Sequence, residues 1–448
     1  MENFIKLFIL ICFFTFNADI TFANHINSLI KSSPLDKTST VAVSVKDTET
    51  GKTVYQYNEQ KLLHPASTLK VFTTVPALDT LEADYDFRTN FYVRNNNLYV
   101  KLSGDPLLSS ENLKNALKDI KAAGYRNFNN VYIDDSVLDN VEFGVGWMWD
   151  DSTNKYVRKF SAYNLDNNIL NIRVYNDNGV IKTDTTSIYK VPVICIVSAG
   201  DKTNLTAIRH DWISPDIIFI KGTVNGSANI QVPINNMQKY FNYRLYATMK
   251  KVNIKVANDV FLNGNVPDDA TCVVSVTHPV SPVIPKIFKD SSNKDCETLV
   301  KIAGGVSENS KGTLENSINL FFDYWNAKSV DTSDVVLADA SGVSRNNLIT
   351  TDFMTNALNV IYKDKGFDNV SELFAQPGDG TLSNRLLNLR GSVWLKTGTL
   401  ENISGLTGYV KTDKGKIYSV AILIQNFNCP QIQIKEFENE IITLIKNL

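Results

Sequence analysis

The hydrophobic and polar positions near the start of the chain predict a β-hairpin followed by a helix. Residues 40–45 and 53–57 are rich in β-branched and aromatic side chains, and residues 47–52 between them have the polar and glycine composition of a turn. Pro65 then precedes a largely apolar run over residues 67–81. Because proline is favoured in the first turn of a helix, we expect this run to be helical.

The middle of the chain, from residue 85 to residue 271, has a different pattern. Short β-rich runs separated by turn clusters occur at residues 91–100, 130–134, 168–175 and 217–223. Helical periodicity is expected at residues 111–123 and 241–252, and a short strand at residues 260–262. The pattern indicates a large β-rich insertion.

Beyond residue 272 the pattern is helical again and then changes to strands. Helices are expected at residues 282–288, 295–303, 314–327, 352–363 and 432–448, and strands at residues 391–396, 405–411 and 416–426. The simplest architecture is an α/β (α+β) domain made of residues 24–84 and 272–448. Residues 85–271 interrupt it and form one or two accessory domains.

The first 23 residues have the pattern of a secretory signal peptide. Lys6 precedes residues 7–16, which are apolar except for Thr15 and too few to span a bilayer comfortably. Small residues lie before Asn24, where cleavage is expected. We therefore expect residues 1–23 to be removed and the mature protein to work in the periplasm without a transmembrane anchor.

Composition excludes some functions. The net charge of −2 and the pI near 6.2 give no basic field for nucleic acid. Four cysteines remain after cleavage, at positions 195, 272, 296 and 429, without the paired spacing of a zinc site. Disulfides are permitted in an exported protein, but the sequence does not choose among three pairings. No metal or cofactor is expected.

Ser67 and Lys70 form the first candidate catalytic pair. Their spacing of three places a hydroxyl and an amine on one face of a helix, one turn apart. A serine becomes a nucleophile when a neighbouring base takes its proton, and a lysine can do so only when uncharged. The same spacing recurs at Ser28, Ser152, Ser187 and Ser291. Only Ser67 begins an apolar helix, whose free N–H groups favour an oxyanion.

The second candidate element is the Lys396-Thr397-Gly398 sequence, which occurs once and is followed by Thr399. It lies on a predicted strand, where Gly398 leaves room for an extended substrate to pair alongside. Lys396 supplies a cation for a terminal carboxylate, and the two threonines supply hydroxyl donors. We therefore predict that these four residues bind substrate.

The third element is Ser291 with Asn293, between two predicted helices. Ser-x-Asn is common in this chain, and Ser307 with Asn309 is the main competitor. We favour Ser291 because it lies at a junction between helices that can be held rigidly, whereas the competitor lies among glycine and polar residues typical of a mobile loop.

The order Ser-x-x-Lys, Ser-x-Asn, Lys-Thr-Gly is typical of penicillin-binding proteins and class A β-lactamases. Over nearly its whole mature length, the chain resembles the low-molecular-mass class C (type-4) penicillin-binding proteins, the D-alanyl-D-alanine carboxypeptidase/endopeptidase family. The resemblance rests on residues 65–70, 103–106, 146–151, 278–282, 339–345, 379–382 and 396–399. It implies a serine β-lactamase/transpeptidase-like domain split by a large insertion. Ser292, Ala340 and Cys296 depart from the usual family pattern without removing a catalytic group.

The resemblance also implies a mechanism of acyl transfer on peptidoglycan stem peptides, with β-lactams as covalent inhibitors. Ser67 attacks the penultimate D-alanine carbonyl while neutral Lys70, near Lys396, takes its proton. Backbone N–H groups of Ser67 and Thr399 hold the oxyanion. Ser291 relays a proton to the leaving amine, and Asn293 binds the substrate amide and orients Lys70.

Two further substrate contacts are implied by the resemblance. Asp151, after two tryptophans, and Arg345, in a Gly/Ser-rich turn, are expected to bind the ammonium and carboxylate of a diaminopimelate side chain. His64 and His278 are interpreted as supporting or core residues. The alternatives are a β-lactamase, against which the long insertion argues, and a catalytically silent peptidoglycan-binding scaffold, against which the complete set of catalytic side chains argues.

Overall fold

A computed structural model describes residues 22–33, 35–185, 189, 191–210, 214–258 and 261–448. Within this part the chain forms two compact units. The first contains the described residues up to Pro76, with Ile284–Ser291 and Ile318–Leu448, and the second contains Ala77–Val283 and Ser292–Ser317. Residues 1–21 of the predicted signal peptide lie outside the described residues. Residues 22–32 are helical, and Phe22 packs edge-on against Tyr55.

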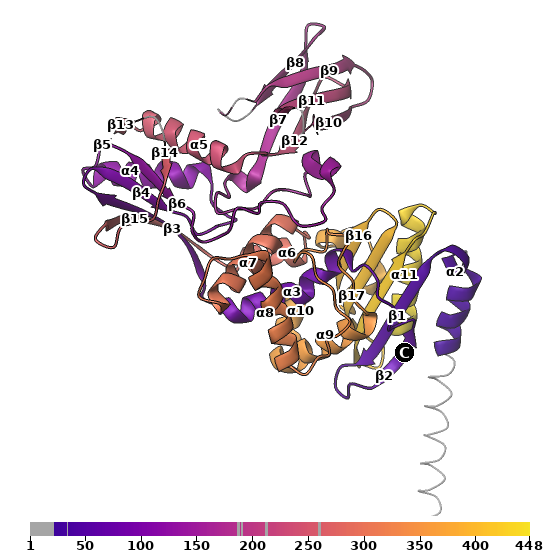
Figure 1. Ribbon diagram of the computed structural model, residues 1–448. Helices are drawn as coiled ribbons and strands as arrows, with labels where there is room; N and C mark the ends of the chain where they lie inside the picture. Colours follow the sequence, from indigo (N-terminus) through magenta and orange to yellow (C-terminus); the bar gives the residue numbers. More distant parts are fainter. Residues whose placement is uncertain (1–21, 34, 186–188, 190, 211–213, 259–260) are drawn as a thin grey trace, which may run out of the picture. The chain divides into compact units, whose positions relative to one another are not determined.

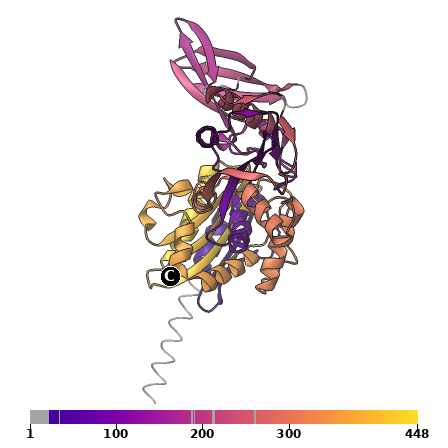
Figure 2. The same cartoon turned by 90° about the vertical axis from the view of Figure 1, so that its left-hand side faces the viewer.

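The first unit is built on an antiparallel sheet of order β16-β17-β18-β1-β2. Strands from opposite ends of the chain lie side by side in it, indigo beside yellow (Figures 1 and 2). The strands are β1 (Thr40–Asp47), β2 (Thr53–Tyr57), β16 (Val393–Leu400), β17 (Ile403–Lys411) and β18 (Ile417–Gln425). The predicted hairpin and the three late strands are therefore present.

Alternation along the strands gives this sheet two buried faces. Val43 of β1 and Leu395 of β16 belong to a core that includes Ile441 of α11 (Gln431–Lys446). Ser44, one position along β1, points the other way and hydrogen-bonds Thr355 of α9 (Thr351–Lys365). Because successive side chains face opposite sides, Lys396 lies on the face opposite Leu395.

Helices complete the first unit. The remaining segments are α2 (Leu35–Thr38), η1 (Ala66–Thr68), α3 (Leu69–Leu81), α6 (Val283–Phe288), α8 (Leu314–Ala327), α10 (Phe367–Leu373), η4 (Gly380–Leu382) and η5 (Leu387–Leu389). Helices α3, α6 and α8 each have residues in both units. Residues 68–77 are all buried, including the polar Thr68, Lys70, Thr73 and Thr74. The predicted helices at residues 67–81 and 314–327 are thus present, the first beginning with a 3₁₀ turn.

The second unit contains a five-stranded sheet of order β14-β6-β4-β3-β15. Its strands are β3 (Asp86–Arg94), β4 (Asn97–Lys101), β6 (Val131–Asp134), β14 (Phe261–Asn263) and β15 (Thr271–Pro279). Helices α4 (Ser110–Ala122) and α5 (Met237–Lys251) pack together, and β5 (Asn127–Phe128) pairs with β13 (Lys255–Val256). Helix α7 (Asn293–Ser307) also belongs to this unit.

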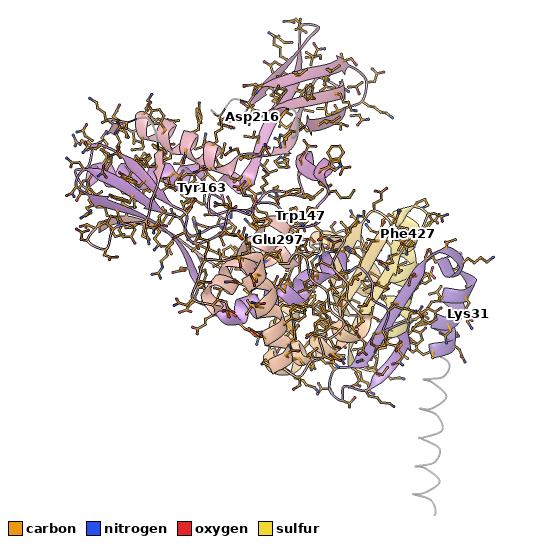
Figure 3. All side chains as sticks on the ribbon, in the orientation of Figure 1. Lys31, Trp147, Tyr163, Asp216, Glu297 and Phe427 are labelled. Carbon is orange, nitrogen blue, oxygen red and sulfur yellow. The ribbon has the colours of Figure 1, made fainter. Side chains whose placement is uncertain are left out.

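Two three-stranded sheets complete the second unit, in the orders β12-β7-β8 and β10-β11-β9. Their strands are β7 (Ile169–Asp177), β8 (Val180–Thr185), β9 (Val193–Ala199), β10 (Asn204–His210), β11 (Ser214–Val224) and β12 (Ser227–Pro233), and the short helices are η2 (Trp149–Thr153) and η3 (Asp166–Asn168). Trp147, Tyr163 and Asp216, labelled in Figure 3, belong to this unit.

Two expectations from the sequence differ from the structure. The single β-rich run at residues 91–100 is a hairpin of β3 and β4, which turns at Asn95 and Asn96 with φ of 48° and 58°. Residues after 271 do not return at once to helix, because β15 pairs with β3 and extends the second unit to Val283.

The four cysteines outside the predicted signal peptide, Cys195, Cys272, Cys296 and Cys429, are free thiols. Cys296 is buried in α7, whereas Cys195 is half-buried on β9. Among the described residues, no helix is both long and apolar enough to cross a bilayer.

Candidate active site

Ser67 lies in a strained turn at the start of a buried helix. It is the one residue in the stretch 63–77 that is not buried. Ala66, just before it, has a φ of 46°, a left-handed conformation that costs about 1–3 kcal/mol and is found mainly at functional sites. The turn therefore presents one hydroxyl from an otherwise closed segment.

Lys70 lies one helical turn beyond Ser67 and points back at it. Its side chain is fully buried, and its Nζ donates to Ser67 Oγ at 2.8 Å and to the carbonyl oxygen of Ser341 at 2.7 Å. Both of these acceptors are uncharged oxygen atoms. The predicted pair is thus in direct contact.

A loop at residues 339–345 supports this pair. Asp339 accepts hydrogen bonds from the backbone N–H of Gly342 at 2.8 Å and of Ser344 at 2.6 Å, which fold the loop into a tight turn. A Cβ atom on Gly342 would lie 1.9 Å from the carbonyl oxygen of Ala66, so only glycine fits there. The sequence marked this segment by resemblance, but its function as a support for Lys70 through the Ser341 carbonyl was not predicted.

Lys396 and Gly398 bring β16 against the same turn. Lys396 is fully buried, and its Nζ donates to Ser291 Oγ and to the Thr397 carbonyl, each at 2.8 Å. A Cβ atom on Gly398 would lie 3.1 Å from the backbone nitrogen of Ser67 and 2.9 Å from the Pro65 carbonyl. Strand and turn therefore touch through backbone atoms. Thr397 is buried on this strand, and Thr399, two residues further along the same strand, is exposed.

Ser291 joins this group, whereas Asn293 has its own contacts in the second unit. Ser291 has a φ of 62°, so it adopts a left-handed backbone conformation, as Ala66 does. Asn293 begins α7, and its Nδ2 donates to the Tyr156 carbonyl at 2.8 Å. The structure thus brings together Ser67, Lys70, Ser291 and Lys396 in the first unit.

His64 is an additional member of the site. Its ring is buried, and its Nδ1 accepts a hydrogen bond from the Ala66 N–H at 3.3 Å. Burial lowers the pKa of His64, and the nearby Asp339 carboxylate opposes that shift only in part. A neutral ring is required for this contact, because a protonated imidazole has no acceptor nitrogen. His64 therefore supports the strained turn, in keeping with the supporting role expected for it.

The two predicted diaminopimelate contacts lie in different units. Asp151 is half-buried in η2 of the second unit, and its Oδ1 accepts from Asn154 at 3.2 Å. Arg345 is exposed in the first unit, at the end of the loop that supports Lys70. His278, which was expected to be a supporting residue, hydrogen-bonds Asp105 at 2.6 Å within the second unit. Among the described residues, no His, Cys, Asp and Glu cluster suited to a metal ion is found.

A serine–lysine pair at the start of a buried helix, beside a strand that carries Lys-Thr-Gly, defines an active-site-serine enzyme of the penicillin-binding class. A model of the D-Ala-D-Ala carboxypeptidase 3 (S13) family matches residues 22–448. The chain belongs to this family of serine peptidases.

Known relatives and structures agree with this assignment. The chain is 24% identical over 450 residues to the D-alanyl-D-alanine carboxypeptidase DacB of Haemophilus influenzae, covering 96% of this chain and 94% of that protein. It is 25% identical over 409 residues to a D-alanyl-D-alanine carboxypeptidase of Actinomadura, covering 84% and 76%. The crystal structure of penicillin-binding protein 4 from Haemophilus influenzae has a TM-score of 0.83 at 22% identity, covering 94% of this chain and 99% of that chain. The expected family, mixed α/β fold and serine-hydrolase class are confirmed.

Proposed function

We propose that this chain cleaves D-alanine linkages of peptidoglycan stem peptides through an acyl-enzyme on Ser67. The observation that carries the proposal is the 2.8 Å contact between Lys70 Nζ and Ser67 Oγ, in a turn that exposes Ser67 alone. Lys70 takes the hydroxyl proton as Ser67 Oγ attacks the carbonyl of the penultimate D-alanine. The C–N bond to the last residue then breaks, and water later hydrolyses the ester.

The edge strand β16 is suited to hold the peptide. It lies at one edge of its sheet, where Ala375 already pairs with Leu395. An extended segment can add as a further strand beside the residues that follow Leu395. Gly398 allows the close approach of this strand to the Ser67 backbone nitrogen. We assign the oxyanion to the N–H groups of Ser67 and Thr399, and we assign Thr397 and Thr399 to the terminal carboxylate, with Lys396 providing the positive charge.

Departure of the amine needs a proton, and Ser291 is the proposed relay. The Ser291 hydroxyl accepts a hydrogen bond from Lys396 Nζ at 2.8 Å. When Ser291 gives its proton to the leaving amine, Lys396 can therefore supply a replacement. Asn293, two residues on, is assigned to the substrate amide and to the orientation of Lys70. Its position at the start of α7, a long buried helix, supports this choice over Asn309, which lies beyond the end of α7.

We also propose endopeptidase activity on D-Ala–diaminopimelate cross-links, with Asp151 and Arg345 as the contacts to the diaminopimelate end. β-Lactams are expected to acylate Ser67, and a crystal structure of penicillin-binding protein 4 from Haemophilus influenzae in complex with a β-lactam, which resembles this chain with a TM-score of 0.77, supports that expectation. Export to the periplasm by the segment 1–23 fits a substrate outside the cytoplasm.

Purified peptidoglycan fragments test the proposal. After incubation with the mature protein, mass spectrometry should detect loss of terminal D-alanine from pentapeptides and conversion of cross-linked dimers to monomers. The variant Ser67→Ala should leave both unchanged. Rapid turnover of nitrocefin without change in the fragments would instead support a β-lactamase, and absence of both activities with bound fragments would support a scaffold.

A further inference from the structure

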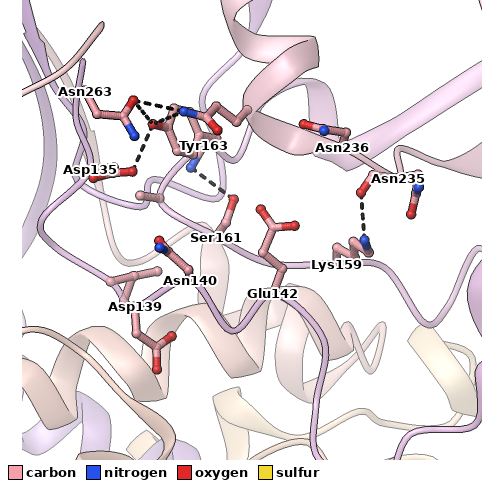
Figure 4. A pocket seen from close by; sticks show the side chains of 13 residues that line it. Asp135, Asp139, Asn140, Glu142, Lys159, Ser161, Tyr163, Asn235, Asn236 and Asn263 are labelled. Atoms are coloured by element: carbon pink, nitrogen blue, oxygen red, sulfur yellow. Dashed lines mark hydrogen bonds between the residues drawn. The ribbon is translucent and has the colours of Figure 1, made fainter. Parts of the chain in front are cut away.

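The second unit contains a polar cavity that the proposed mechanism does not use. It has a volume of about 360 Å³, within the range typical of small-molecule sites. Its wall comes from the segments 135–142 and 159–163, the start of α5 and the end of β14, all within this unit (Figure 4). Amide side chains are the most frequent polar groups in its lining and include Asn140, Asn236 and Asn263. Such a lining offers paired donors and acceptors to a ligand.

The charged groups around the cavity are largely compensated. Asp139 is paired with Lys301, and Asp135 accepts a hydrogen bond from the Tyr163 hydroxyl at 2.9 Å. Lys159 Nζ donates to the Asn235 carbonyl at 2.8 Å. Carboxylates outnumber the one lysine in the wall, so an anionic ligand would be disfavoured. Because Asp139 and Lys159 already have partners, the neutral amide groups are the main contacts that the cavity offers to a ligand.

Glu142 occupies the middle of this cavity. Figure 4 shows its carboxyl group directed into the space between Ser161 and Lys159. Burial raises the pKa of Glu142, although Lys159 and Lys301 oppose the shift. A carboxyl group in its protonated form can both donate and accept a hydrogen bond, as a ligand hydroxyl requires.

An apolar hollow adjoins the polar cavity, and the two share Lys159 and Asn235 as a common wall. The hollow has a volume of about 300 Å³ and is lined by Trp147 and Trp149 among others. Trp149 is 64% exposed, which is unusual for so large an apolar ring. Its ring is accessible from solvent. Aromatic side chains that are partly apolar and partly exposed to water are typical of binding surfaces.

We propose that the polar cavity and the adjoining hollow together bind a neutral saccharide, namely the N-acetylated amino sugars of a glycan strand. Sugar hydroxyl and acetamido groups match the amide and carboxyl lining, and the apolar face of a sugar ring matches Trp149. Stem peptides, which carry free carboxylates, fit this wall less well. The proposal rests on the proposed function only in that peptidoglycan supplies both the peptide and the glycan.

The test uses the mature protein and a neutral probe, the β-1,4-linked tetramer of N-acetylglucosamine, with affinity measured by calorimetry. Asn140→Ala is expected to weaken binding by about tenfold, the scale of one lost hydrogen bond. Glu142→Leu and Trp149→Ala should weaken it as well, and Glu142→Gln should retain most of it. The matched control is Asn229→Ala, because Asn229 is an exposed asparagine of the same unit outside the cavity.

Labelling of Ser67 by a fluorescent penicillin is measured in the same variants and should stay at the wild-type rate. Failure of the proposed function would abolish labelling without affecting sugar binding, so the two results are separable. No binding of the tetramer, or binding that the cavity variants and Asn229→Ala change equally, would overturn the saccharide site. Tighter binding of a sugar-free stem peptide, weakened by Asn140→Ala, would overturn it too by showing a peptide site.

Discussion

Lys396 Nζ lies 2.8 Å from Ser291 Oγ, although 105 positions separate the two residues. Lys396 comes from the edge strand β16, and Ser291 comes from the segment that follows α6 and adopts a φ of 62°. A left-handed serine is maintained only where its surroundings fix it. This contact therefore joins two of the three sequence elements into one group, and Lys70 with Ser67 supplies the third.

Asn293→Ala tests the middle element. Loss of one donor to the transition state should slow acylation by penicillin about 100-fold. The measurement is the rate of labelling by a fluorescent penicillin, with Asn309→Ala as the control that should keep the wild-type rate. A normal rate in Asn293→Ala with a slow Asn309→Ala would reverse the assignment.

Gly398→Ala tests the close approach of β16 to the nucleophile. The added methyl group would lie 2.9 Å from the Pro65 carbonyl and 3.1 Å from the Ser67 nitrogen, so strand and turn must separate. Displacement of the oxyanion donors should lower the acylation rate by about 100-fold. Gly415→Ala is the control, because Gly415 has a positive φ but nothing within 4 Å of an added Cβ. It should lower the melting temperature without slowing acylation, and equal rates in the two variants would contradict the account.

Much of the first unit could be predicted from the sequence because its elements are long and strongly patterned. The helix expected at residues 314–327 coincides with α8 (Leu314–Ala327), and the strands expected at residues 405–411 and 416–426 match β17 and β18 closely. The hairpin of β3 and β4 was missed because apolar residues continue on both sides of its turn. Adjacent Asn95 and Asn96 are typical of a tight hairpin turn and would have indicated it.

Other features leave little or no signal in the sequence, and the reasons for this are physical. Strand β15 depends on pairing with β3, nearly two hundred residues earlier, and its half-exposed residues give little local signal. In the active site, the side chains of Ser67, Lys70 and Lys396 were identifiable by type and spacing. The Ser341 carbonyl that accepts from Lys70 was not, because a backbone acceptor is the same in every residue.

His64→Asn tests the acid sensitivity of the turn. Because burial lowers the pKa of His64 from 6.5, the folded chain binds fewer protons there than the unfolded chain. Its contribution to stability is thus complete above pH 6.5 and is lost as the pH falls toward the lower folded pKa. Asparagine keeps an acceptor for the Ala66 N–H, since it can bond two residues along, but does not titrate.

The measurement is the melting temperature of wild type and of each His64 variant, taken from pH 7.5 down to pH 5 in steps of about half a unit. Wild type should lose more stability than His64→Asn over this window, and His64→Leu should be less stable than both at the upper end. Parallel curves for wild type and His64→Asn would show that another group is responsible for the loss.

Asp151→Ala tests substrate choice. Removing its carboxylate should lower kcat/KM on peptides with a free diaminopimelate end, because the ammonium of that end loses its partner. Penicillin acylation should hardly change, since penicillin has no such group. Arg345→Ala should show the same split, through the carboxylate. Equal losses on peptide and penicillin would assign Asp151 to support of the fold or the catalytic centre.

The most direct test of the whole account is covalent labelling of Ser67→Ala by a fluorescent penicillin, read by intact-protein mass spectrometry. Ser67→Ala should form no adduct and release no D-alanine, and its melting temperature should be close to that of wild type. Ser28→Ala, which removes another serine of a Ser-x-x-Lys sequence, should label fully. A covalent β-lactam adduct on Ser67→Ala would show that the nucleophile lies elsewhere and would contradict the mechanism.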